Sequence, residues 1–142
     1  MPTYHVDEFS FEVPDGYRDD TLNLFVPEQK NNGGFSLTVA RQPRTDADVD
    51  EEMNTLFDAL AGMSKDVRVL ARRATTVATV PAVEARVQAR ETAIRTYQRV
   101  LGLGHYEHLL VFTITSERAH HKRCDAVADA LFASLKLREV TA

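Results

Sequence analysis

The chain has 142 residues and a formal net charge of −4, from 17 Lys and Arg residues against 21 Asp and Glu residues. This length predicts a single domain over residues 1–142. An acidic balance without a clustered basic stripe argues against nucleic acid as a partner. The sole cysteine, Cys124, cannot form an internal disulfide, so the composition gives no sign of an oxidising compartment.

No segment is typical of a membrane anchor or a secretory leader. The longest purely aliphatic or aromatic run covers residues 109–112, which is far too short to cross a bilayer. The polar residues His5, Asp7 and Glu8 stand where a signal peptide would be apolar. We therefore expect a soluble, cytoplasmic protein with no direct attachment to a membrane.

The N-terminal part of the chain is predicted to be β-structure. Pro14-Asp15-Gly16 is typical of a turn, because proline presets the first turn position and glycine relieves steric strain. Residues alternate in polarity on both sides, which predicts a hairpin-like start whose faces are Phe9, Phe11 and Val13 on one strand and Leu22, Leu24 and Val26 on the next. A further strand over residues 35–41 places Leu37 and Val39 on one side and ends at Pro43.

Two amphipathic helices are predicted. Thr45 is a suitable N-cap for the first, since acidic residues follow it at the positive end of the helix dipole, and Gly62 is a natural end. The apolar stripe of this helix consists of Val49, Met53, Leu56, Phe57 and Leu60. Ser116 is a suitable cap for the second helix, whose apolar stripe consists of Cys124, Val127, Ala128, Leu131 and Leu135.

The segment between the helices contains strands and one ambiguous block. Residues 67–71, 75–80 and 106–115 are predicted strands, with a turn at residues 103–105. Residues 82–101 fit a helix, because Ala, Glu, Arg and Gln dominate, but they also fit two strands with a turn near residues 91–92. Periodicity and propensity alone favour the helix.

Several short motifs occur in an order that is similar to a known family. The N-terminal segment combines Tyr4, an acidic residue and a Phe with the turn Pro14-Asp15-Gly16-Tyr17 and the pattern Asp19-x-Thr21-x-Asn23. Later come Val80-Pro81-Ala82, Tyr97-Gln98 and Phe112-Thr113-Ile114-Thr115. This order resembles the DcrB-like family over residues 4–137, and within it the Eag group of cytoplasmic chaperones that load type VI secretion effectors.

The resemblance implies an α+β fold of the PsbP-like type, with a curved antiparallel sheet and two helices packed on one face. It also implies that residues 82–101 form two strands, and we adopt that interpretation against the helix propensity of the block.

Catalytic and metal sites are not expected. His105 and His108 would point to opposite faces of one strand, and His120 with Cys124 lacks a third ligand at a suitable spacing. The chain has no Gly-x-Ser-x-Gly nucleophile turn and no phosphate-binding glycine loop. We therefore expect a protein without a metal or cofactor that is not an enzyme.

A binding surface is the remaining candidate site. If Leu22, Leu24, Leu37 and Val39 share an uncovered sheet face, they form an apolar patch of the kind that marks an interaction site; if they face the helices, they are core. The resemblance implies that these residues, with Gln98, bind the apolar N-terminal segment of a secreted effector, in a homodimer. The alternative function is a non-catalytic PsbP-like module that binds a soluble protein or a small ligand.

Overall fold

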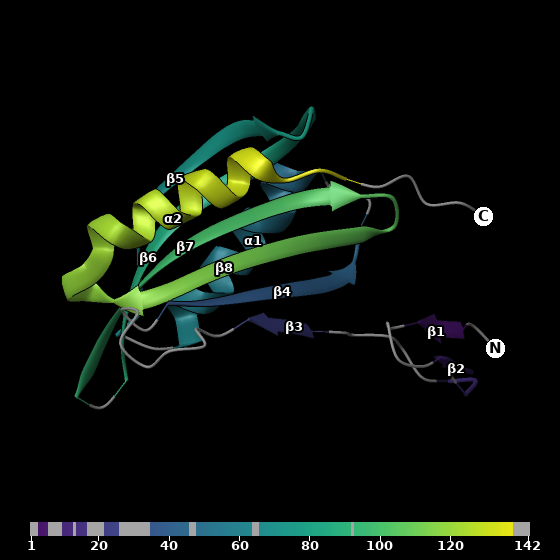
Figure 1. The fold of residues 1–142 in the computed structure, drawn as a ribbon, viewed down its shortest axis with the longest axis horizontal. Coiled ribbons are helices and arrows are strands. Elements are labelled where there is room, and N and C mark those ends of the chain that lie inside the picture. The colour runs from purple at the N-terminus through teal and green to yellow at the C-terminus, as the bar shows by residue number, and fades with distance from the viewer. Residues whose placement is uncertain are drawn as a thin grey trace.

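The main sheet has six antiparallel strands in the part of the chain that the structure describes (Figure 1). This structure is a computed structural model, and it describes residues 3–5, 10–12, 14–16, 22–25, 35–45, 48–63, 66–91 and 93–137. The strands are β3 (Leu22–Phe25), β4 (Ser36–Pro43), β5 (Arg68–Val77), β6 (Val80–Glu91), β7 (Ile94–His105) and β8 (His108–Glu117). Their order across the sheet is β3-β4-β8-β7-β6-β5. The predicted α+β class and antiparallel sheet are confirmed.

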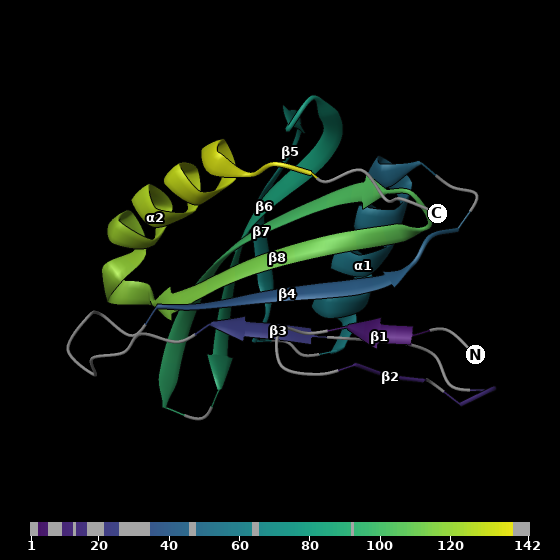
Figure 2. The ribbon, with the colours of Figure 1, turned by 45° about the vertical axis from the view of Figure 1, so that its right-hand side comes forward.

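The two helices lie on opposite faces of this sheet, so their predicted placement on one face is wrong. The helix α2 (His121–Ser134) follows the short 3-10 helix η1 (Arg118–His120) and packs against β7 and β8. The helix α1 (Val49–Met63) packs against β5, β6 and β7 from the other side. Figures 1 and 2 show α2 in front of the strands and α1 behind them. We call these two faces the α2 side and the α1 side.

The long strands contribute to two separate cores, one under each helix. On β8, Phe112 and Ile114 belong to the core beneath α2, whereas Leu109 and Val111 belong to the core beneath α1. A run of apolar residues without alternation is therefore required, because both sides of the strand are buried.

Residues 82–101 form strands β6 and β7, as the resemblance implied and helix propensity did not. Ala82 is buried towards α2, while Val83 and Ala85 are buried towards α1. Small side chains let both helices approach the sheet closely, which explains the Ala-rich composition. Gly102 on β7 shows the same constraint, because an added Cβ atom would collide with the side chain of Met53 on α1.

The hairpin turns lie at positions slightly different from those predicted. Ala78 and Thr79 connect β5 to β6 with φ angles of 51° and 66°, as in the two-residue turns that match strand twist. The turn between β7 and β8 is at Tyr106, which has a φ of 56°, so residues 103–105 belong to β7 and the predicted turn there is wrong.

The helix ends also differ from the predictions. Asp48 caps α1, since its Oδ1 atom accepts a hydrogen bond from the Glu51 N–H at 2.9 Å; Thr45 lies too far upstream. The helix ends at Met63, one residue beyond Gly62. Ser116 does not cap α2, because it is a buried residue of β8 whose hydroxyl donates to the Glu117 carbonyl.

The buried stripe of α2 is only partly as predicted. Cys124 and Ala128 are buried, whereas Val127 is 42% exposed. Phe132 takes the third buried position, one turn after Ala128.

The predicted N-terminal hairpin across Pro14-Asp15-Gly16 is wrong. The strand β2 (Ser10–Glu12) pairs with β1 (Thr3–His5) in a separate two-stranded sheet, and β3 pairs with β4. Phe9, Val13 and Val26, which were predicted to share faces with these strands, lie outside the described residues.

Candidate binding surface

Three rows of directly paired residues cross the α1 side of the sheet and define its chemistry. Paired residues of antiparallel strands point to the same face, so the register identifies each row. One row runs Leu24, Thr38, Thr113, Val100 and Ala85, and the next runs Leu22, Ala40, Val111, Gly102 and Val83. The third runs Ser36, Thr115, Gln98 and Val87.

The helix α1 covers only one end of these rows. Ala85, Val100 and Val87 are buried beneath it, at 1–3% exposure. At the other end, Leu22 is 59% exposed and Leu24 is 60% exposed. We name the remaining area the open sheet surface, and it consists of Leu22, Leu24, Ser36, Thr38, Ala40, Gln98, Thr113 and Thr115.

The open sheet surface combines an apolar edge with a band of small polar side chains. Thr38, Thr113 and Thr115 are half-buried neighbours on adjacent strands. The Gln98 Nε2 atom donates a hydrogen bond to the Thr115 hydroxyl at 3.3 Å, which fixes the orientation of the amide. The surface therefore offers apolar area beside hydroxyl and amide groups that can donate and accept hydrogen bonds.

The predicted site residues divide between the two faces. Leu22, Leu24 and Gln98 lie together on the α1 side, as part of the open sheet surface. Leu37 and Val39 lie on the α2 side, where they pack against the core beneath α2. The prediction that all four aliphatic residues are in phase is wrong, because β3 pairs with β4 so that Leu22 opposes Ala40 and Leu24 opposes Thr38.

Sequence reasoning missed the threonines of the surface. Thr113 and Thr115 alternate with the buried Phe112 and Ile114 on β8, and this period of two places both hydroxyls on one face. The alternation is visible in the sequence. Only the structure shows that α1 leaves this end of the face uncovered.

On the α2 side, a buried arginine links the helix to the sheet. Arg99 on β7 is 3% exposed, and its guanidinium lies 2.9 Å from Asp125 Oδ1 and 3.0 Å from Asp129 Oδ1, both on α2. Glu84 on β6 lies 3.4 Å away from the same group. The Tyr97 hydroxyl donates to Asp125 Oδ1 at 2.6 Å. These contacts join α2 to two neighbouring strands.

The same contacts shift the pKa values of the group. Burial opposes the ionisation of Asp125, but hydrogen bonds from Tyr97 and Arg99 together hold its pKa below the usual range. Burial, reinforced by the hydrogen bond to Asp125, raises the pKa of Tyr97. Because the Arg99 guanidinium holds carboxylates of both α2 and β6, the arrangement is that of a structural tie between helix and sheet.

The histidines and the cysteine do not form a metal site in the part of the chain that the structure describes. His105 and His108 are directly paired across the β7–β8 hairpin, so the prediction that they point to opposite faces of one strand is wrong. Among the described residues, however, no three His, Cys, Asp or Glu side chains gather closely enough to hold an ion. Cys124 is fully buried, and burial raises the pKa of its thiol.

No helix among the described residues combines the length and the apolar character that crossing a membrane requires.

Comparison with known proteins identifies the fold and the family. Similar solved structures include a protein of unknown function from Pseudomonas aeruginosa, with a TM-score of 0.83, 17% identity and 99% of each chain covered. Another is PsbP (CyanoP) from Synechocystis sp. PCC 6803, with a TM-score of 0.55, 10% identity, and 94% of this chain and 89% of that chain covered. At these identities the likeness shows a shared PsbP-like fold. No curated protein matches the chain. The model of the DcrB family matches residues 8–134, so the chain belongs to the DcrB family.

Proposed function

We propose that this protein is a non-enzymatic cytoplasmic chaperone or adaptor that binds the apolar N-terminal transmembrane segment of a secreted effector, of the type VI class. The segment occupies the open sheet surface, and the protein acts as a homodimer. Membership of the DcrB family and the PsbP-like fold are compatible with a binding module, and the sequence resemblance to the Eag chaperones supplies the class of client.

The observation that carries the proposal is the exposure of Leu22 and Leu24 beside a polar band. Two neighbouring leucines that are 59% and 60% exposed cost hydration free energy unless a partner covers them. Covering this exposed area contributes about 1–2 kcal/mol for each leucine before association costs are subtracted.

The polar band suits a helix better than an entirely apolar groove would. Transmembrane helices carry Gly, Ser and Thr at positions where other helices approach closely. Thr38, Thr113 and Thr115 present short side chains, so a helix backbone can approach the sheet, and the Gln98 amide can pair with a client hydroxyl or carbonyl. The combination shields apolar area and fixes the position of the client along the surface.

Co-expression with a client fragment tests the proposal. The fragment contains only the N-terminal apolar segments of an effector encoded beside this protein, and it should be soluble with the chaperone and insoluble without it. Leu24→Asp should abolish the rescue, because it places a charge on the open sheet surface. Phe25→Asp is the matched control: Phe25 is 56% exposed on the same strand but, opposite Leu37, it faces the α2 side.

Two results contradict the proposal. One is equal loss of rescue in the Leu24→Asp and Phe25→Asp variants when both remain folded by circular dichroism. The other is a fragment that stays insoluble with the wild-type protein. Light scattering after size exclusion tests the homodimer separately, and a monomeric mass would remove that part of the proposal.

A further inference from the structure

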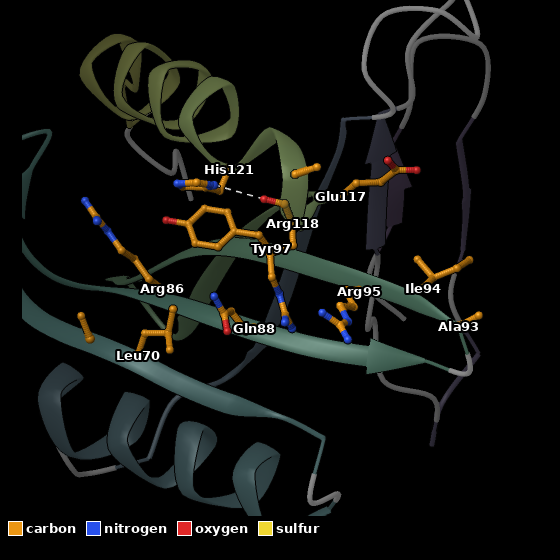
Figure 3. Close-up of a pocket in the computed structure, with 12 residues that line it drawn as sticks. Leu70, Arg86, Gln88, Ala93, Ile94, Arg95, Tyr97, Glu117, Arg118 and His121 are labelled. Atoms are coloured by element: carbon orange, nitrogen blue, oxygen red, sulfur yellow. Dashed lines mark hydrogen bonds between the residues drawn. The ribbon is translucent and has the colours of Figure 1, made fainter.

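A large hollow on the α2 side differs in chemical character from the open sheet surface. It has a volume of about 1,070 Å³ and is bounded by β5, β6, β7 and the start of the η1–α2 segment (Figure 3). This volume is slightly above the usual range for small-molecule sites, about 300–1,000 Å³. Gln88 and Tyr97 are directly paired on its strands, and their face is the one that carries Arg99 and α2. The hollow and the open sheet surface therefore lie on opposite faces of the sheet.

The polar lining of the hollow is predominantly basic. Arg86 and Arg95 come from the strands, and Arg118 and His121 come from η1 and α2. Figure 3 shows the side chains from the strands and those from the helical segment lining one space. Among the described residues that line the hollow, Glu117 is the one carboxylate, and its side chain is 67% exposed. We name this site the arginine hollow; it consists of Arg86, Arg95, Arg118 and His121 with Tyr97 and the apolar residues Leu70 and Ile94.

Two pairs of directly opposed arginines destabilise the sheet beneath the arginine hollow. Arg86 is directly opposite Arg99, and Arg90 is directly opposite Arg95. Like charges at paired positions destabilise a sheet. Arg99 has three carboxylate partners, Asp125, Asp129 and Glu84. Arg86 and Arg95 form no direct ion pair with the described residues, although the charge of Arg86 helps to lower the pKa of Asp125.

The two groups from the helical segment are held in fixed positions. The Arg118 Nη2 atom donates to the Ala89 carbonyl at 3.3 Å, and its Nε atom is buried without a hydrogen-bond partner among the described residues. The His121 Nδ1–H donates to the Arg118 carbonyl at 3.1 Å, since a carbonyl oxygen only accepts. The imidazole also packs edge-on against Tyr97, with ring centroids 5.8 Å apart. A partly desolvated guanidinium and an oriented imidazole thus face a space whose described lining contains a single acid, the exposed Glu117.

We propose that the arginine hollow binds an organic phosphate that carries an apolar part. Guanidinium groups bind phosphate oxygens through paired N–H donors, and a phosphate monoester offers more acceptors and charge than a carboxylate. Leu70 and Ile94, which are 44% and 58% exposed at the rim, provide the surface for the apolar part. The ligand offsets the positive charge that Arg86, Arg95 and Arg118 bring together in the lining.

Titration of the full-length protein with three probes tests this inference. Hexyl phosphate should bind at one site per chain, at least about tenfold more tightly than inorganic phosphate, because each buried methylene group contributes. Hexyltrimethylammonium, which keeps the alkyl chain and reverses the charge, should not bind. Amide shifts in ¹H–¹⁵N spectra should concentrate on β6, β7 and the start of α2, and isothermal calorimetry gives the affinities.

A double variant locates the site. Arg86→Gln with Arg95→Gln should weaken hexyl phosphate binding at least about tenfold, while Arg41→Gln, which removes an exposed arginine of β4 outside the hollow, should leave it unchanged. The melting temperature of each variant confirms that it folds. The inference is overturned by any of three results: no saturable binding of hexyl phosphate, an affinity no higher than that of inorganic phosphate, or equal weakening by Arg41→Gln. Client rescue is unaffected by these variants, so this test is independent of the proposed function.

Discussion

Replacing Arg99 by Met should destabilise the fold strongly, because the arginine is the centre of the charge network between α2 and the sheet. The side chain is 3% exposed and has three carboxylate partners at 2.9–3.4 Å. Asp129 can turn to water, since its side chain is 69% exposed, and Glu84 keeps its ion pair with Arg73. Asp125 is 23% exposed and would lose the guanidinium that offsets its partly buried charge. Removing one member of such a pair costs about 3–5 kcal/mol when burial is complete, and we expect about 3 kcal/mol here.

Urea unfolding followed by circular dichroism measures this loss directly, and the melting temperature should fall by about 10 °C. Asp129→Asn is the matched control. It removes an exposed partner of the same guanidinium and should cost less than about 1 kcal/mol. If Arg99→Met costs no more than Asp129→Asn, the network does not stabilise the attachment of α2, and our account of it is wrong.

Three further predictions concern close packing, acid stability and thiol reactivity. Gly102→Ala should destabilise the protein by about 1–3 kcal/mol, since the new methyl group meets the side chain of Met53 on α1. In the same unfolding assay Gly62→Ala, whose methyl group meets nothing within 4 Å, should be neutral or stabilising by up to about 1 kcal/mol. Because the pKa of Asp125 is lowered in the folded protein, its carboxylate contributes stability above the pKa of the same group in the unfolded chain, about 3.9, and this contribution is lost as the pH falls through the folded value. The unfolding free energy of Asp125→Asn should therefore change less than that of the wild type between pH 5 and 2. Cys124 should react with a thiol reagent only at the rate of unfolding, because it is fully buried and its pKa is raised, and rapid modification of the native protein would contradict its place in the core.

The sequence specifies the strands of this protein less clearly than its helices, for a physical reason. Strands β6 and β7 are covered by a different helix on each face, so buried residues occur at consecutive positions, as at Ala82 and Val83. Such strands lack a simple period of two, and their alanines mimic helix propensity. Only the order of motifs shared with the DcrB-like family predicted two strands there.

The sequence of β8 contains part of the information on where the two helices lie. Its run of residues 109–112 is apolar at every position, a pattern that indicates burial on both sides of a strand. The prediction of helices on one face did not use this signal. Correct use of the run at Leu109 and Leu110 would have placed one helix on each face.

The candidate site was predicted incompletely because it depends on strand register. Leu22 and Leu24 were correctly expected to share a face, but their phase relative to Leu37 and Val39 is set by how β3 aligns with β4. A shift of one residue exchanges the two faces. The apolar pattern of two short strands does not specify that shift, and so half of the predicted aliphatic set belongs to the core beneath α2.

Photo-cross-linking within the complex with a client tests the central claim most directly. A photoreactive amino acid is placed at position 24, on the open sheet surface, or at position 25, its equally exposed neighbour on the other face. Our account predicts cross-links to the apolar segment of the client from position 24 and none from position 25. Cross-links from position 25 alone, or from both positions equally, would contradict the assignment of the open sheet surface as the binding site.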